Sequence, residues 1–239
     1  MNSAQFSIIV PVFHEGDRIN DLLEHLFQID RGRNCEIIIV DGAPEKDTLK
    51  SIHSNHVTKA SSEKGRAKQM NAGASIASGE ILIFLHADTE LPALAFEKIS
   101  TVMEEGGYIA GAFDLSIKSD RLIFKIIACL ASLRSRLNRI PYGDQAIFIR
   151  KEYFDKIGGY KEIPLMEDVE LMKRIKKSGY KIRILYDRVK TSPRRWEQEG
   201  VIYCVLRNWT LQIFYALGIS PHHLVRFYRS GYRRARNDG

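Results

Sequence analysis

A histidine and an aspartate stand two residues apart at the end of a strongly apolar stretch of this chain. Ile81–Leu85 is a run of five apolar residues, and His86 and Asp88 follow it almost at once. Such a run is typical of a strand that is buried on both faces of a parallel sheet. Residues two apart on an extended backbone point to the same side, so these two side chains can meet one metal ion or one ribose. The alternative is a strand that ends in a solvated turn.

Polar side chains also follow two earlier apolar runs. Phe6–Val12 leads to His14 and Glu15, and Glu36–Val40 leads to Asp41. In an open α/β sheet, the loops after the strands line one crevice. We therefore expect these two loops to converge with the loop that follows the third apolar run.

A nucleotide in this crevice would be held without either of the common nucleotide-binding motifs. The sequence contains no Gly-x-Gly-x-x-Gly and no Gly-x-x-x-x-Gly-Lys, so it has neither a dinucleotide fingerprint nor a P-loop. Acids would then bind the ribose and the base, and a cation would bind the phosphates. Lys64 and Arg66 offer fixed positive charge, and Asp88 offers the hard oxygen ligand that Mg²⁺ or Mn²⁺ prefers.

The elements expected to position these residues alternate between strand and helix. Three apolar runs in the first half are separated by helical stretches, which predicts βαβ crossovers and a mostly parallel central sheet flanked by helices. In the second half the pattern predicts further strands at Tyr108–Ile117, Gln145–Ile149 and Tyr180–Leu185, and helices at Pro92–Glu104, Leu122–Leu137, Glu167–Lys177 and Val201–Leu217. The fold class is therefore α/β. No linker or repeat divides residues 1–239, so we expect a single domain.

Composition indicates an ordinary globular protein of a reducing compartment. The three cysteines, Cys35, Cys129 and Cys204, lie in three different segments. Their spacing argues against a disulfide framework and against a zinc knuckle, and it favours a cytoplasmic location.

The net charge of +7 is concentrated at the end of the chain. From Arg188 onward there are ten Lys or Arg residues and three Asp or Glu residues, whereas the first 187 residues carry 26 of each sign. A basic, aromatic tail of this kind can serve nucleic acid, anionic lipid or a diphosphate substrate. Leu122–Leu133 carries one charge, but it falls short of the roughly 18 residues needed to span a bilayer. Contact with a membrane would then be peripheral, at the inner face.

Four motifs together resemble a known family. They are Ile8–Glu15, Ile39–Gly42, the stretch Gly65–Gly73, and His86-Ala87-Asp88. The resemblance is to the inverting family 2 glycosyltransferases of GT-A fold, and it covers nearly the whole chain. This sequence departs from the family pattern at two places, because His14 stands where the family usually has asparagine and His86 replaces the first acid of the Asp-x-Asp signature.

The resemblance implies a role for each of these motifs. Nucleotide contacts fall on Pro11, Val12, His14, Glu15, Asp41 and Arg66, with the acid after the second strand reading the nucleobase. Asp88 inherits the metal role, for Mn²⁺ or Mg²⁺. For His86 three interpretations stay open, namely a metal ligand, a ribose contact, or neither.

The catalytic base is implied by a motif later in the chain. Met166–Leu171 resembles the family's Glu-Asp motif, in which the aspartate is the general base, and this aspartate is Asp168 here. Glu167 would then orient the base or bind the acceptor. An aspartate at a helix start is also a favourable cap, because the helix dipole stabilises it, and this is the alternative interpretation.

Two further segments carry candidate contacts to the acceptor, the donor sugar or the diphosphate. Asp144 and Gln145 precede a predicted strand. Arg194, Arg195 and Trp196 can form a loop over the diphosphate, with bidentate guanidinium contacts and a face for sugar stacking. A basic exposed turn with a core tryptophan explains the same residues. The glutamine that begins the motif of processive synthases is absent, so we do not infer a polymerase.

Taken together, the sequence is identified as a member of this family, and three functions are weighed. The first is an inverting transferase that moves a sugar from a nucleotide diphosphate sugar, UDP-linked by expectation, to a hydroxyl acceptor that can be lipid-linked. Its nucleotide half would be 1–105, its acceptor half 106–190 and its basic helical tail 191–239. A sugar nucleotidyltransferase would want a glycine-rich loop that Val12–Asp17 lacks. The third is a non-catalytic protein that binds a membrane surface or nucleic acid through its tail, with nucleic acid the weaker expectation.

Overall fold

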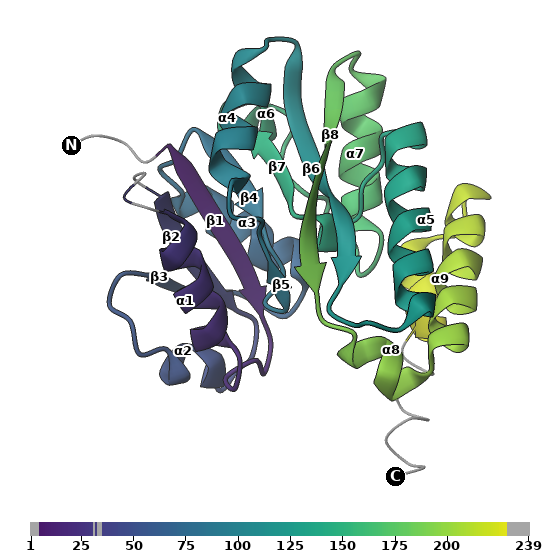
Figure 1. The fold of residues 1–239 in the computed structure, drawn as a ribbon, viewed down its shortest axis with the longest axis horizontal. Coiled ribbons are helices and arrows are strands. Elements are labelled where there is room, and N and C mark those ends of the chain that lie inside the picture. The colour runs from purple at the N-terminus through teal and green to yellow at the C-terminus, as the bar shows by residue number, and fades with distance from the viewer. Residues whose placement is uncertain (1–4, 31, 33–34, 229–239) are drawn as a thin grey trace.

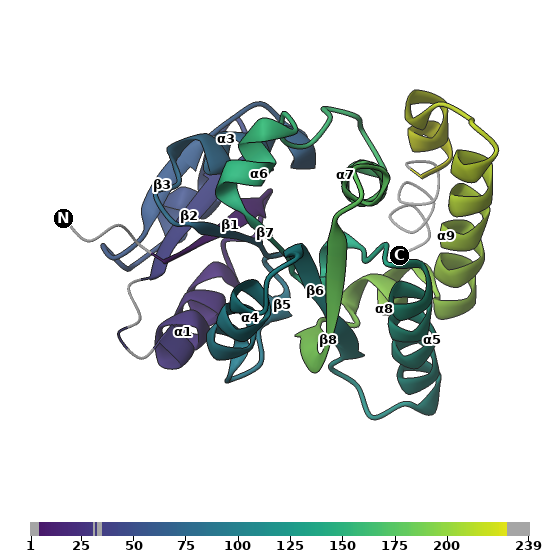
Figure 2. The same ribbon diagram turned by 90° about the horizontal axis from the view of Figure 1, so that it is seen from above.

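One eight-stranded sheet forms the centre of the molecule. The computed structural model describes residues 5–30, 32 and 35–228. The strands lie in the order β3-β2-β1-β4-β7-β6-β8-β5, and helices cover both faces of the sheet (Figures 1 and 2). The expected α/β class is confirmed.

The first half of the sheet is parallel, as the sequence predicts. Its strands are β1 (Phe6–Val12), β2 (Cys35–Asp41), β3 (Thr58–Ser61) and β4 (Ile81–Phe84). β1 pairs in parallel with both β2 and β4, and β2 pairs in parallel with β3. The carboxyl ends of these strands therefore lie along one edge, and the loops that follow them begin there. The connecting helices are α1 (Ile19–Asp30), α2 (Asp47–Ser51) and α3 (Arg66–Ile76).

The second half of the sheet is mixed. Its strands are β5 (Thr89–Glu90), β6 (Tyr108–Ile117), β7 (Ile147–Arg150) and β8 (Lys181–Thr191). β7 runs antiparallel to both β4 and β6, and β5 runs antiparallel to β8, whereas β6 and β8 are parallel. The antiparallel pairing of β4 with β7 joins the two halves into one sheet.

The remaining helices pack against this mixed half or extend beyond it. They are α4 (Ala95–Glu104), α5 (Leu122–Asn138), α6 (Lys151–Lys156), α7 (Glu167–Lys177), α8 (Arg194–Glu199) and α9 (Val201–Ala216), with a short 3-10 turn at Gly143–Gln145. Residues 221–228 are helical as well. α1, α4 and α5 lie on one face of the sheet, and α3, α6 and α7 lie on the other (Figure 2).

The hydrophobic core forms two layers because strand side chains alternate between the faces of the sheet. In β1, Ile8 and Val10 join the layer beneath α1 and α4, and Ile9 joins the layer beneath α3 and α7. All three residues are fully buried. Burial on both faces explains why this strand reads as a continuous apolar run.

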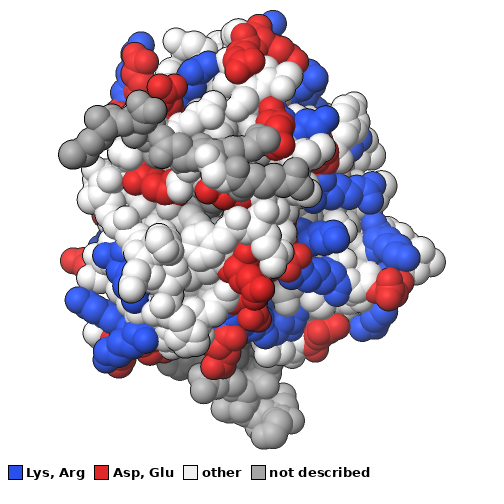
Figure 3. Space-filling view, turned by 60° about the vertical axis from the view of Figure 1, so that its left-hand side comes forward, with Lys and Arg blue, Asp and Glu red and all other residues white. Residues whose placement is uncertain are grey.

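Several element boundaries differ from those expected. The helix predicted to open at Pro92 begins at Ala95, the strand predicted from Gln145 begins at Ile147, and the strand predicted to end at Leu185 continues to Thr191. Over the residues that the structure describes, no helix combines the length and apolar character that crossing a bilayer requires. The expected tail 191–239 is helical in its described part, and residues 229–239 lie outside the described residues. The surface over the N-terminal half carries both acidic and basic side chains (Figure 3).

Candidate functional site

The loops after β1 and β2 are held together by polar contacts at the carboxyl edge of the sheet. His14 Nδ1 lies 2.8 Å from Asp47 Oδ2, and this contact raises the pKa of the His14 imidazole. The backbone N–H of Glu15 donates to the Thr48 hydroxyl at 3.0 Å. The Gly42 N–H donates to the Val12 carbonyl at 3.1 Å. The two predicted nucleotide loops therefore form one continuous structure.

Asp41 and Val12 are more deeply buried than a direct ligand contact requires. The Asp41 carboxylate is buried and accepts the N–H groups of Ala43 at 2.8 Å and Leu49 at 3.4 Å. The Val12 side chain belongs to the core, and Pro11 is half-buried beside it. These residues therefore shape the carboxyl edge of β1 and β2 from inside the protein.

Gln69 is a positioning residue that the sequence did not single out. Its buried side-chain amide donates to the carbonyls of Val12 at 2.7 Å and Val40 at 2.8 Å, so it ties the ends of β1 and β2 together. Gly42 leaves room for it, because a Cβ on that glycine would stand 2.8 Å from the Gln69 amide. The only sequence signal is its place one turn before Gly73, on the face of α3 that meets the sheet.

The loop after β4 brings His86 against the 3-10 turn and α7. A Cβ on Gly143 would stand 2.9 Å from His86 Nε2 and 3.6 Å from Asp168 Oδ2, so the three residues are neighbours. Within the described residues, His86 Nε2 is buried and has no hydrogen-bond partner. Burial and the charges of Arg66 and Arg195 hold the pKa of His86 well below its usual value, so the imidazole is neutral.

Asp88 is anchored from the end of β8. Its carbonyl accepts the N–H of Ser192 at 3.1 Å, and its carboxylate accepts the hydroxyl of Thr89 at 3.3 Å. Thr89 in turn bonds Thr191 across the β5–β8 pair. A contact between segments about a hundred residues apart in the chain thus fixes the candidate metal ligand.

Three carboxylates influence one another in this site. Burial, together with the charges of Asp168 and Asp88, raises the pKa of Asp144 to about 6, although the charge of Arg134 opposes the shift. Asp168 accepts the N–H of Gly143 at 2.7 Å and lies in the first turn of α7, where the helix dipole favours a negative charge. The predicted base and the predicted metal ligand are thus brought to one place.

Arg66 links the nucleotide edge to α7. It pairs with Glu167 at 3.4 Å, and the Arg66 side chain is 45% exposed, so the guanidinium can still reach a ligand. Glu167 is buried, and this burial raises its pKa even though Arg66 lies beside it. Arg134 stacks on the Tyr142 ring, 3.3 Å from its centroid, and supplies a second cation next to Asp144.

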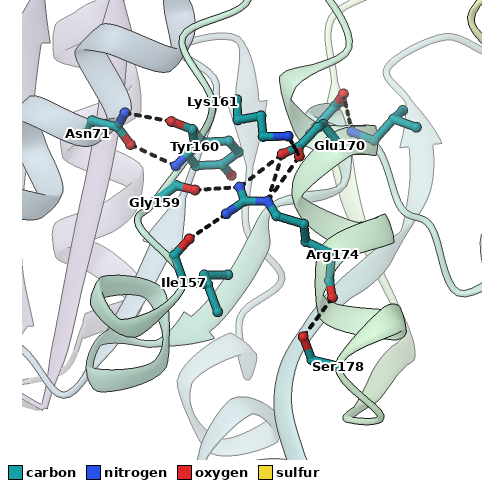
Figure 4. Close-up of polar contacts among 10 residues, drawn as sticks. Asn71, Ile157, Gly159, Tyr160, Lys161, Glu170, Arg174 and Ser178 are labelled. Atoms are coloured by element: carbon teal, nitrogen blue, oxygen red, sulfur yellow. Dashed lines mark hydrogen bonds and ion pairs between the residues drawn. The ribbon is translucent and has the colours of Figure 1, made fainter. Parts of the chain in front are cut away.

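A polar network joins α7 to the segment that precedes it and to α3 (Figure 4). Arg174 pairs with Glu170 and donates to the carbonyls of Ile157 and Gly159. The Asn71 side chain of α3 exchanges two hydrogen bonds of 2.9 Å with the backbone of Tyr160. The segment before α7 is therefore tied to both α3 and α7, and this network sets the direction in which the first turn of α7 presents its acids.

The predicted contacts in the 3-10 turn and in α8 divide into two groups. Gln145 is fully buried, donates to Phe113, and accepts from Ser135 and Tyr142, so its amide is engaged inside the protein, and its contact with the acceptor stays a prediction. Trp196 packs edge-on against Phe124, with the ring centroids 6.1 Å apart, in agreement with the core alternative.

The two arginines of α8 reach the site from the far end of the chain. Arg194 pairs with Glu15 at 3.0 Å and so closes α8 onto the loop after β1. Arg195 pairs with Glu199 at 3.3 Å, and its charge acts on His86. The basic segment therefore lies beside the crevice, and Arg194 is occupied by a carboxylate in this state.

A sequence model described as Glycosyl transferase family 2 matches residues 7–161 of the chain. The match spans well over half of the chain and includes the loops after β1, β2 and β4. The protein belongs to this family. The family membership is the one that the sequence predicts.

Two proteins are similar in sequence to part of this chain. The dolichol-phosphate mannosyltransferase of Pyrococcus furiosus is 26% identical over 110 residues, which cover 44% of this chain and 31% of that protein. The PGL/p-HBAD biosynthesis glycosyltransferase of Mycobacterium tuberculosis is 27% identical over 184 residues, which cover 67% of this chain and 64% of that protein. The chain thus spans less than two thirds of the length of either relative.

Two solved structures match the fold of this chain, which is the GT-A fold. The mannosyltransferase PcManGT from Pyrobaculum calidifontis, in complex with GDP-Man and Mn²⁺, matches with a TM-score of 0.63 at 19% identity over 80% of this chain and 57% of that chain. TarS of S. aureus, in complex with UDP, matches with a TM-score of 0.58 at 17% identity over 79% of this chain and 60% of that chain.

The side chains of Asp88 and His86 are candidate ligands for a divalent metal. Asp88 provides a carboxylate, and the buried, unpartnered Nε2 of a neutral His86 is a second donor. In the part of the chain that the structure describes, no three His, Cys, Asp or Glu side chains are grouped closely enough to hold a metal by themselves. The remaining ligands would therefore come from the phosphates and from water, which is usual for Mg²⁺ in phosphate sites.

Proposed function

We propose that this glycosyltransferase moves a sugar from a nucleoside diphosphate sugar to a hydroxyl group, with inversion, and that Asp168 is the general base. One observation carries the proposal. Asp168, held by Gly143, lies beside His86, and the charges of Asp168, Asp88 and Arg66 all act on Asp144. The site thus combines a candidate base, Asp168, with the carboxylate of Asp88 and the positive charge of Arg66. These groups suit a reaction in which an acceptor hydroxyl attacks a sugar and a diphosphate leaves.

The nucleotide would lie along the ends of β1 and β2. Its base and ribose would meet the backbone near Pro11 and Val12 and the side chains of the loop after β1. Its diphosphate would approach Arg66 and Arg195, whose positive charge stabilises the phosphate oxygens. We take UDP as the first candidate nucleotide. GDP is the second, because the complexes of the structural neighbours contain GDP-Man or UDP.

The chemical step is a single displacement. The Asp168 carboxylate takes the proton of the acceptor hydroxyl as that oxygen forms a bond to the anomeric carbon. The bond from the anomeric carbon to the phosphate oxygen breaks, and its electron pair leaves on the diphosphate, next to Arg66. A divalent metal held by Asp88 and His86 would neutralise the same developing charge.

The acceptor that we propose is a hydroxyl on a lipid-linked molecule. Support comes from the relative of Pyrococcus furiosus, which is named for dolichol phosphate. Residues 1–105 would hold the nucleotide, 106–190 would hold the acceptor, and 191–239 would supply the basic tail. Glu167 and Asp144 lie closest to the base and would orient the acceptor.

The test measures nucleoside diphosphate release from UDP-sugars and GDP-sugars in the presence of Mn²⁺ or Mg²⁺, with extracted membrane lipids as acceptor. We expect Asp168→Asn to lower turnover by about 10²–10⁴-fold while nucleotide binding is unchanged. Asp155→Asn is the matched control, because this carboxylate lies in an exposed ion pair with Lys151. Undiminished turnover in Asp168→Asn would refute the base assignment. Conversion of the nucleotide sugar to nucleoside triphosphate and sugar 1-phosphate only when pyrophosphate is added would point to a nucleotidyltransferase.

A further inference from the structure

The outward face of α5 is apolar along its whole length. Leu122, Ile126, Leu130, Leu133 and Leu137 recur every three or four residues, and their exposed fractions range from 45% to 76%. The opposite face of the same helix packs against the sheet. Monomeric proteins rarely expose a continuous stripe of this kind unless another surface covers it.

A second apolar stripe lies beside the first. α9 exposes Ile202, Leu206, Trp209 and Ile213, and Leu217 continues the series, with exposed fractions from 57% to 74%. α5 and α9 lie side by side in both views of the ribbon (Figures 1 and 2). We call the combined surface the α5–α9 face.

The charged residues within α5 and α9 are all basic, and exposed acids stand just before each helix, at Asp120 and Glu197. The sequence has no Asp or Glu between Arg121 and Gly143, and none between Gly200 and Asn237. Arg121, Lys125, Arg139 and Arg226 are exposed within these stretches. By contrast, the surface over the N-terminal half shows acidic as well as basic side chains (Figure 3). Apolar stripes on two helices whose own charged residues are all basic match the chemistry of an anionic bilayer surface.

We propose that the α5–α9 face docks on the surface of a bilayer that contains anionic lipids, with both helices lying in the plane of the interface. A second copy of the chain fits less well, because the basic residues of the two copies would then face each other. Trp209 and Tyr203 are exposed among aliphatic side chains, and both residue types favour the boundary between hydrocarbon and water.

The α5–α9 face borders the catalytic site. Arg134 of α5 stacks on Tyr142 next to Asp144, and Arg195 lies over Tyr228 of the helical segment that follows α9. Docking would therefore place the site at the membrane surface, where a lipid-linked hydroxyl is presented. This orientation rests on the proposed function, whereas the docking itself does not.

The experiment is flotation of the full chain with vesicles of phosphatidylcholine, with or without phosphatidylglycerol. We expect binding to the vesicles with phosphatidylglycerol, weakened by salt, and a loss of about tenfold or more in the double variant Leu130→Glu/Leu206→Glu. Lys125→Glu should weaken binding by about fivefold to tenfold, because each basic residue near an anionic surface contributes to the attraction.

Controls use side chains of similar exposure elsewhere on the molecule. Ile76 and Leu94 are 49% and 46% exposed in the N-terminal half, so Ile76→Glu/Leu94→Glu should float like the wild type. Lys98→Glu is the matched control for Lys125→Glu. All these positions are exposed, and circular dichroism should confirm that each variant is folded.

Three results would overturn the proposal. They are no flotation of the folded wild type, equal flotation with both kinds of vesicle, or a dimer that the Leu130→Glu/Leu206→Glu variant dissociates without any flotation. The last result would assign the α5–α9 face to a second copy of the chain. Flotation uses neither donor nor acceptor, so a protein that floats but releases no nucleoside diphosphate would refute the proposed function alone.

Discussion

At the scale of single residues, the site separates its carboxylates by their surroundings. Asp144 is held in a partly buried position among other acids, which raises its pKa to about 6, whereas Asp168 accepts a backbone N–H at a helix start. Different surroundings give neighbouring acids different roles in many active sites. Here the surroundings of Asp144 favour its neutral form, whereas Asp168, the proposed base, is held by a backbone N–H.

Substitution of Asp144 should change the pH dependence of stability. Because the pKa of Asp144 is raised in the folded state, the wild type loses stability as the pH rises from the ordinary value of 3.8 through about 6. Asp144→Asn cannot ionise, so its free energy of unfolding should exceed that of the wild type by roughly 1–2 kcal/mol above about pH 7 and match it near pH 4. Urea unfolding at several pH values measures the difference.

The control for this prediction is an exposed aspartate. Asp120 is exposed in the loop before α5, and Asp120→Asn should leave the difference from wild type flat with pH. If the advantage of Asp144→Asn is the same at acid and neutral pH, the surroundings of Asp144 do not favour its neutral form.

At the scale of elements, sequence periodicity predicts helices and strands whose pattern is local. It misses strands that form only through pairing with residues far away in the chain. β1, β6 and α7 begin and end where the pattern predicts, because each has an unbroken apolar rhythm. β5 and the second half of β8 have no such rhythm. They exist because Thr89 and Glu90 pair with Thr191 and Lys190 about a hundred residues later.

The candidate site divides in the same way. The positions of Asp88 and Asp168 follow from strand and helix ends that the sequence marks. The burial of Gln145 could not be predicted, because its three partners come from β6, α5 and its own turn. The buried Gln69 was missed for the same reason, since its partners are backbone carbonyls of two strands.

Substitution of Gln69 tests how the ends of β1 and β2 are held together. Gln69→Leu leaves the carbonyls of Val12 and Val40 without their side-chain donor, and this should lower the free energy of unfolding by about 1–3 kcal/mol. Loosening of the loops after β1 and β2 should also raise the Kd for nucleoside diphosphate. Thermal unfolding and calorimetric titration measure the two effects. Gln28→Leu, at an exposed position on α1, is the control, and equal behaviour of both variants would contradict the role given to Gln69.

At the scale of the whole molecule, the segment that follows β8 lies against the first loop of the chain, beside the candidate site. The parallel half supplies the crevice, the antiparallel pairing of β4 with β7 attaches the second half, and α8 reaches back to the first loop through the Arg194–Glu15 pair. Beyond α8 the packing thins. Of the sixteen residues of α9, only Cys204, Arg207 and Leu211 are buried.

Hydrogen exchange should follow this gradient in packing. Amides of β1 should exchange only through global unfolding, whereas amides of α9 should exchange at least about a hundredfold faster by local opening. α7 is the control helix, because six of its eleven residues are buried, and it should exchange slowly. Mass spectrometry of peptides resolves the three elements. Equal protection of α9 and β1 in the protein without lipid would contradict the account, and vesicles with phosphatidylglycerol should slow exchange in α5 and α9 but not in β1 or α7.

The central claim is that donor chemistry takes place between Asp88, Arg66 and Asp168. A crystal structure of the protein soaked with UDP or GDP and Mn²⁺ tests it most directly. We predict density for the diphosphate against Arg66, with the metal about 2.2 Å from an Asp88 oxygen and the Asp168 carboxylate open to the sugar side. Density for the nucleotide away from the ends of β1 and β2, or a bound metal that does not touch Asp88, would contradict the account.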